Sequence, residues 1–242
     1  MAKSYPTHPV QMPLDLAIAP ATGRDDLIVS ASVALAADLV DRWPDWPGRI
    51  AILYGPKGCG KTHLAEIWKN AADACTLDMK DMAIEDAMRA ASAGSVVLDD
   101  LDPDAIDETS LFHLVNAVTQ NDNYMLVSAR RHPATWQFSL ADLASRISAA
   151  TVVEIGPPDD DLLTQVIVKL FADRQITAEA KVIDYMMVRM ERSLAVAHEI
   201  VDAMDQLALA RGTRITRKLA AEVLGAHNNP GQNARAQDAS NV

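Results

Sequence analysis

Residues 50–62 read Ile-Ala-Ile-Leu-Tyr-Gly-Pro-Lys-Gly-Cys-Gly-Lys-Thr, a short apolar run followed by a glycine-rich loop. The run is typical of a buried parallel strand, and residues 61–72 favour a helix. Glycines at this spacing let backbone N–H groups converge on phosphate oxygens at the positive end of that helix. The segment is therefore a complete Walker A loop in its required strand–loop–helix setting. The predicted nucleotide-binding residues are Gly55, Pro56, Lys57, Gly58, Cys59, Gly60, Lys61, Thr62 and His63.

A second motif, residues 96–100, is the apolar strand Val-Val-Leu followed by Asp99 and Asp100. In P-loop proteins an acid at this place holds Mg²⁺ together with the hydroxyl of the loop, and a second acid polarises the attacking water. We therefore expect Lys61 to reach the β- and γ-phosphates, Thr62 and Asp99 to hold Mg²⁺, and Asp100 to be catalytic. The alternative interpretation, a strand end with solvated carboxylates, is weaker because the Walker A loop lies upstream.

The order of the remaining elements predicts an α/β fold, a parallel sheet with helices on both sides, followed by an all-helical unit. Strands are expected at 50–54, 75–77, 95–98, 124–127 and 151–155. Helices are expected before the first strand at 30–40, and between later strands at 61–72, 82–93 and 108–120. After Gly156-Pro157-Pro158 only helices are expected, at 160–174, 178–189, 194–211 and 216–224, with Asp159 as an N-cap. The predicted domains are an extended arm (1–20), an αβα base (21–156), a helical lid (157–225) and a disordered tail (226–242).

Composition narrows the class of protein. The chain has 242 residues, a formal net charge of −11 and a pI near 4.9. A field of that sign repels phosphate backbones, so we expect no direct sequence-specific DNA binding. No apolar run approaches the ~20 residues needed to span a bilayer, and Met1 to Pro9 lacks a signal-peptide core. Cys59 and Cys75 are too few for a disulfide framework. A cytoplasmic protein with no membrane partner is predicted.

The segment Asp142-Leu143-Ala144-Ser145-Arg146 lies just before the last predicted strand. An arginine at this place suggests a finger that reaches the γ-phosphate held by a neighbouring subunit, and Arg146 is therefore a candidate catalytic residue. Spacing alone leaves the alternative open that Arg146 is an ordinary solvated surface arginine.

These motifs together resemble the AAA+ module of the bacterial initiator DnaA. The resemblance rests on Gly-Lys-Thr-His-Leu at residues 60–64, on Asp99-Asp100 and on Leu-Ala-Ser-Arg at 143–146, and it runs from about Asp25 to Leu224. It implies a RecA-like αβα base with a helical lid, ADP or ATP as the nucleotide, and Mg²⁺. DnaA continues past the lid into a helix-turn-helix DNA-binding domain, for which the residues after Leu224 are too few.

A lone DnaA-like module with an N-terminal arm is similar to the Hda family of regulators, which inactivate DnaA. In that family the arm carries a peptide that binds the DNA polymerase sliding clamp, the β subunit. The stretch Gln-Met-Pro-Leu-Asp-Leu at residues 11–16 is similar to that peptide, with an amide for a polar pocket and apolar side chains for a groove. The predicted clamp-binding residues are Gln11, Met12, Leu14, Asp15 and Leu16. The alternative is a tail that docks on its own domain.

The Hda resemblance implies a negative regulator of DNA replication initiation that is tethered to the DNA-loaded clamp and stimulates hydrolysis of DnaA-bound ATP. Two departures from the family pattern predict weak or no turnover by the chain itself. The sensor 1 position offers Ser128 or Ala129, of which only Ser128 can hydrogen-bond through its side chain. At sensor 2, Val196 stands where the arginine is expected, and Arg192 is the candidate substitute.

Other functions stay open at this stage. A self-sufficient AAA+ ATPase that loads a helicase, or a DnaA-like initiator factor, is the alternative. The preference for ADP or ATP and the oligomeric state, including a homodimer, are open as well.

Overall fold

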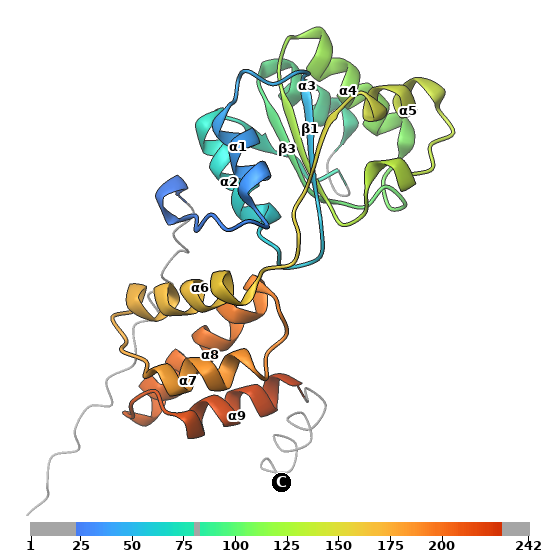
Figure 1. Ribbon diagram of the computed structural model, residues 1–242. Helices are drawn as coiled ribbons and strands as arrows, with labels where there is room; N and C mark the ends of the chain where they lie inside the picture. Colours follow the sequence, from blue (N-terminus) through green and yellow to red (C-terminus); the bar gives the residue numbers. More distant parts are fainter. Residues whose placement is uncertain (1–22, 80–82, 229–242) are drawn as a thin grey trace, which may run out of the picture.

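The computed structural model describes residues 23–79 and 83–228. The predicted clamp-binding segment, residues 11–16, lies outside them. Five strands form one parallel sheet in the order β2-β3-β4-β1-β5 (Figure 1). The strands are β1 (Ile50–Tyr54), β2 (Cys75–Thr76), β3 (Val96–Leu101), β4 (Met125–Ala129) and β5 (Thr151–Glu154). The parallel sheet confirms the predicted α/β class.

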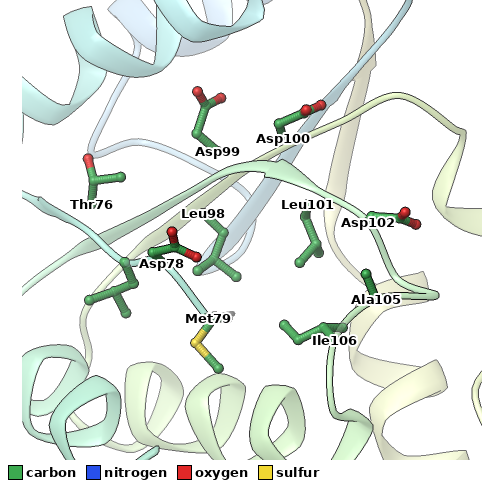
Figure 2. A pocket seen from close by; sticks show the side chains of 11 residues that line it. Thr76, Asp78, Met79, Leu98, Asp99, Asp100, Leu101, Asp102, Ala105 and Ile106 are labelled. Atoms are coloured by element: carbon green, nitrogen blue, oxygen red, sulfur yellow. The ribbon is translucent and has the colours of Figure 1, made fainter. Parts of the chain in front are cut away.

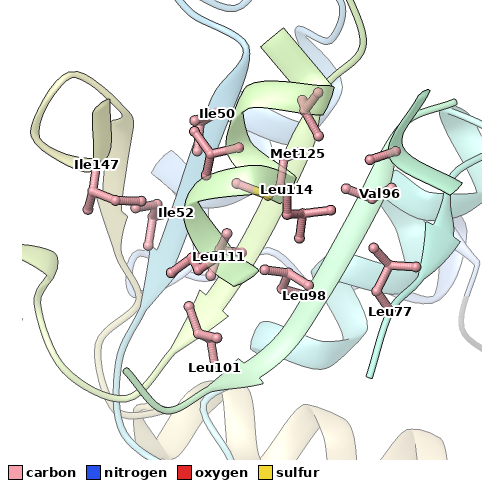
Figure 3. Close-up of a cluster of buried hydrophobic side chains, with 14 of the residues drawn as sticks. Ile50, Ile52, Leu77, Val96, Leu98, Leu101, Leu111, Leu114, Met125 and Ile147 are labelled. Carbon is pink, nitrogen blue, oxygen red and sulfur yellow. The ribbon is translucent and has the colours of Figure 1, made fainter. Parts of the chain in front are cut away.

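Helices cover both faces of the sheet, because successive strand side chains point to opposite sides. In β1, Ile50 and Ile52 pack with the side chains of α3, α4 and α5, whereas Ala51 and Leu53 pack with those of α1 and α2. Figure 3 shows the α4 side of this core, where side chains of that helix gather over β3 and β4. The helices are η1 (Arg24–Asp26), α1 (Ala34–Asp41), α2 (Lys61–Ala71), α3 (Ile84–Ala93), α4 (Glu108–Gln120), η2 (Pro133–Thr135) and α5 (Ala141–Ser148).

The rest of the described chain is a helical lid with an apolar core of its own (Figure 1). Its helices are α6 (Asp160–Asp173), α7 (Ala180–Met187), α8 (Leu194–Arg211) and α9 (Arg217–Asn228). Asp159 caps α6 as expected, since its carboxylate accepts the Leu162 N–H at 2.7 Å. An ion pair of 2.7 Å between Lys169 of α6 and Asp26 of η1 ties the lid to the base. None of the helices within 23–79 and 83–228 has the length and apolarity needed to cross a bilayer.

Three local expectations differ from the structure. The first long helix begins at Ala34 instead of residue 30, and the Ser30 and Ser32 hydroxyls before it hydrogen-bond to each other at 2.8 Å. The segment that carries Arg146 is a helix, α5, because Leu143 and Ile147 four residues apart are both buried. Finally, α9 continues to Asn228, past the predicted start of the tail, with Val223 and Leu224 buried in the lid core.

Candidate functional site

The glycine-rich loop between β1 and α2 is shaped by positions that accept no side chain. A Cβ on Gly55 (φ +158°) would lie 2.2 Å from the carbonyl oxygen of Ile155. A Cβ on Gly58 (φ +74°) would lie 1.9 Å from the Ser193 Oγ. The loop therefore packs directly against the end of β5 on one side and against the lid on the other.

Lys61, the first residue of α2, is only 7% exposed although it carries an ammonium group. Its Nζ donates to the carbonyl oxygens of Gly55 at 2.8 Å and Pro56 at 2.7 Å. A buried ammonium needs such acceptors, because an unpaired buried charge is costly. The side chain thus lies within the curve of the loop, where a phosphate group would supply stronger acceptors than two carbonyls.

Three strand and helix ends bring a set of oxygen atoms together beside Lys61. The Thr62 hydroxyl donates to one carboxylate oxygen of Asp99 at 2.9 Å. The Ser128 hydroxyl donates to the other carboxylate oxygen, and it accepts the Asp100 N–H at 2.7 Å. Thr62, Asp99 and Ser128, chosen from separate motifs, are therefore one hydrogen-bonded group.

The Thr62 and Asp99 oxygens suit Mg²⁺, a hard cation that keeps several waters and takes phosphate oxygens when it binds with a nucleotide. The described residues contain no group of three or more His, Cys, Asp or Glu side chains arranged to hold a metal ion. The donors thus fit an ion that needs phosphate oxygens to complete its shell, and they do not form a protein-only metal site.

A β-bulge puts Asp99 and Asp100 on the same side of β3. Leu98 pairs with Val127 but Leu101 with Ala129, so β3 holds one extra residue between the pairs. The extra residue is accommodated by Asp100, whose φ is +50°. Figure 2 shows the result: the carboxylates of Asp99 and Asp100 lie on one side of the strand, and the side chains of Leu98 and Leu101 lie on the other. All four residues line a pocket of about 280 Å³. In a regular strand, consecutive side chains would lie on opposite faces.

The carboxylate of Asp100 is held by Arg130, the residue that follows β4. The guanidinium Nε donates to Oδ1 at 2.9 Å and one terminal nitrogen to Oδ2 at 2.5 Å. The paired carboxylate raises the pKa of Arg130 above its ordinary value. Sequence reasoning missed this residue, because Arg130-Arg131 has no motif that separates it from ordinary surface charge.

A cleft of about 340 Å³ separates the loop and α2 from the lid. Its walls combine apolar side chains from both parts with two histidines and several charged groups. The lining residues include Leu27, Val33, Cys59, Thr62 and His63 from the base, and Leu162, Val166, Leu194 and His198 from the lid. Burial lowers the pKa of both His63 and His198, since it disfavours the charged imidazole. The shape suits a ligand with a flat apolar part and a phosphate tail.

The two candidate arginines lie elsewhere. Arg146 is on α5, on the face of the sheet opposite α2, and no ion pair joins it to another described residue. Arg192 pairs with Asp160 at the start of α6, at 2.8 Å. The residue that meets the loop is Ser193, next to a Leu194 N–H that donates to the Gly58 carbonyl at 2.8 Å. The sequence predicts an N-cap at Ser193, directly before α8, but it does not predict that Ser193 contacts the loop.

Comparison with known proteins supports the same architecture. No family model matches the chain. DnaA from Campylobacter jejuni is 22% identical over 196 residues, which covers 72% of this chain and 44% of that protein. The chain therefore spans less than half the length of these relatives.

Solved structures of AAA+ proteins resemble this chain. Domain III of Thermotoga maritima DnaA matches with a TM-score of 0.71 at 16% identity, over 86% of this chain and 97% of that one. AMPPCP-bound DnaA from Aquifex aeolicus matches with 0.66 at 18%, over 90% and 71%. The Thermotoga maritima RuvB branch migration motor matches with 0.61 at 15%, over 74% and 61%.

The fold is the AAA+ fold, a RecA-like αβα base with a parallel sheet followed by a small helical lid. Within that class, the sequence is related to DnaA.

Proposed function

We propose that this chain is an adenine-nucleotide-binding regulator of replication initiation, of the Hda kind, that stimulates hydrolysis of ATP bound to DnaA. The intact Walker A loop, the Thr62–Asp99 pair and the cleft beside α2 support nucleotide binding. The relationship to DnaA, one structure of which holds AMPPCP, supports adenine as the base.

Each part of the site has a place in nucleotide binding. Lys61 exchanges the carbonyls of Gly55 and Pro56 for the β- and γ-phosphates, and the loop N–H groups take the remaining oxygens. Thr62 and Asp99 would hold Mg²⁺, which would neutralise phosphate charge when bound. His63, the next residue of α2, lines the cleft beside the sugar and base.

The observation that carries the regulatory part of the proposal is the place of Arg146. Since the sheet separates α5 from α2, Arg146 acts on a nucleotide held by a neighbouring molecule. An arginine supplied in trans stabilises transition-state charge on the γ-phosphate. The relationship to DnaA makes that AAA+ protein the proposed neighbour.

The chain's own turnover is proposed to be weak. Val196 stands where a sensor arginine is expected, and the nearby Arg192 is engaged by Asp160. With ADP bound and Arg146 acting on a neighbouring molecule, the chain is proposed to be an activator of another ATPase rather than a fast enzyme.

The clamp is the second proposed partner. The proposed contact is the segment of Gln11, Met12, Leu14, Asp15 and Leu16. Gln11 provides an amide contact, and Met12, Leu14 and Leu16 provide three apolar anchors. Tethering raises the local concentration of the regulator around DNA-bound DnaA, in the cytoplasm, without a DNA-binding surface of its own.

The decisive experiment measures hydrolysis of ATP pre-bound to DnaA, with clamp loaded on DNA, in the presence and absence of this chain. Stimulation that requires both the clamp and the chain supports the proposal. The complete Thr62–Asp99–Asp100 arrangement favours one alternative, a self-sufficient ATPase acting as a helicase loader or initiator factor. Strong clamp-independent turnover by the chain alone, without an effect on DnaA, would establish that alternative.

A further inference from the structure

We propose that Arg130 is a positioning residue that holds Asp100 against β4 and thereby limits this chain's own ATP hydrolysis. The inference rests on the proposed nucleotide binding, and it accounts for the weak ATP turnover proposed for this chain. It is carried by a two-point ion pair beside the Thr62–Asp99–Ser128 group, and not by the departures at the sensor positions.

Both partners of the ion pair are fixed by the sheet. Asp100 lies in the bulge of β3, and its N–H is bonded to the Ser128 hydroxyl. Arg130 follows Ala129, the β4 residue that pairs with Leu101. The register of β3 on β4 thus brings the two side chains to one sheet edge, and two parallel N–H···O bonds set the carboxylate plane.

The chemistry of hydrolysis explains why this arrangement restrains Asp100. A water oxygen forms a bond to the γ-phosphorus, the bond from that phosphorus to the bridging oxygen breaks, and its electron pair leaves with ADP. A base takes the proton that the water loses. A carboxylate whose two oxygens both accept from a guanidinium is held in one orientation, and fewer of its lone pairs are free to accept the hydrogen of the attacking water.

The neighbouring arginine provides a matched comparison. Arg131 has the same charge and is the next residue along the chain, but it pairs with other acids. Its partners are Asp104 at 2.5 Å and Asp102 at 3.5 Å. The Arg130 side chain is 59% exposed, and exposed ion pairs contribute little to stability. Arg130→Ala is therefore expected to fold, which thermal unfolding checks.

The test measures steady-state ATP hydrolysis and ATP affinity for the full chain and its Arg130→Ala, Arg130→Lys and Arg131→Ala variants. We expect Arg130→Ala to raise kcat about tenfold or more with KM unchanged, since base catalysis contributes at least this much. Arg130→Lys keeps the charge but cannot form the two parallel hydrogen bonds of a guanidinium. Its kcat is expected to lie between those of the wild type and Arg130→Ala. Arg131→Ala should match the wild type.

Adding Asp100→Asn to Arg130→Ala should abolish the gain, which separates release of Asp100 from a general structural effect. An unchanged or lower kcat in Arg130→Ala, or a gain that survives Asp100→Asn, overturns the inference while leaving the proposed function intact. No nucleotide binding by the wild type in calorimetry overturns both.

Discussion

Lys61 is the residue on which the proposed nucleotide binding depends. Its ammonium is enclosed by the loop and bonded to the carbonyls of Gly55 and Pro56, so it is already desolvated and oriented. A ligand phosphate therefore gains a charge-assisted bond without the cost of ordering a long, flexible side chain.

Lys61→Ala is predicted to abolish tight binding of ADP and ATP. The phosphate charge loses its nearest cation, whereas α2 keeps its shape because Ala is a good helix former. Calorimetry with ADP measures the effect. Lys181→Ala, an exposed lysine of α7 paired with Glu179, is the control. Equal affinity in the two variants would mean that the loop is not the nucleotide site.

Arg146→Ala is predicted to leave folding and ADP binding intact and to remove stimulation of DnaA. Arginine fingers are worth on the order of a thousandfold in rate, and Arg146 lies across the sheet from the loop. DnaA-bound ATP hydrolysis is the measurement, with Arg89→Ala, an exposed arginine of α3, as control. Loss of the chain's own ADP binding would instead place Arg146 in cis.

At the scale of elements, α2 of the base and α8 of the lid face each other across the cleft. His63 on α2 is faced by Asp26 and Lys169, and its Nε2 is buried without a hydrogen-bond partner among the described residues. His198 on α8 is faced by Asp202 and by Arg174 of the loop after α6. Burial at this cleft lowers the pKa of both imidazoles.

The free energy of unfolding is therefore predicted to fall in acid, because of the two histidines at the cleft. Both folded-state pKa values lie below the ordinary value of about 6.5, because burial disfavours the charged form. Below that pH the unfolded chain binds more protons, so the free energy of unfolding falls as the pH drops towards the folded-state pKa. Above it, these two groups contribute no pH dependence.

Urea unfolding of the wild type at about pH 7.5 and about pH 5.5 spans the range in which histidine titrates. Between these two pH values, the free energy of unfolding of the His63→Gln/His198→Gln double variant should fall less than that of the wild type. His113→Gln, on the exposed side of α4, is the control and should behave as the wild type does. An identical pH dependence in the double variant and the control would contradict the prediction.

At the scale of the whole molecule, the proposed reaction involves a surface on this chain, a nucleotide on another protein and DNA. The chain carries a formal net charge of −11, which disfavours its attraction to DNA, and we propose that a partner supplies that attraction. A short peptide that binds a clamp already on DNA fulfils that need.

Gln11→Ala, or Leu14→Ala with Leu16→Ala, is predicted to abolish clamp binding and leave the AAA+ module folded. Binding by short peptides depends on few anchors, and loss of one commonly costs more than ~1 kcal/mol. DnaA inactivation should then fail although Lys61 and Arg146 are unchanged. Surface plasmon resonance on immobilised clamp compares these variants with a chain starting at Ala21. Equal binding by all of them would place the clamp contact elsewhere.

The sequence by itself determined those features that are contiguous in the chain. The Walker A loop, the paired acids of β3 and the alternation of strands with helices are local patterns, and local backbone geometry dictates them. It also predicted the αβα base and the helical unit after residue 156, because hydrophobic periodicity marks which faces are buried. It misjudged helix ends such as Val33 and Asn228, where packing and not propensity decides.

Only the tertiary structure decided which distant residues meet. The pair of Asp100 with Arg130 depends on a bulge and on the register of β3 against β4. The contact of Ser193 with Gly58 depends on how the lid docks. The place of Arg146 opposite the loop depends on which face α5 covers. Such contacts follow from the summed packing of many side chains, which no short sequence pattern encodes.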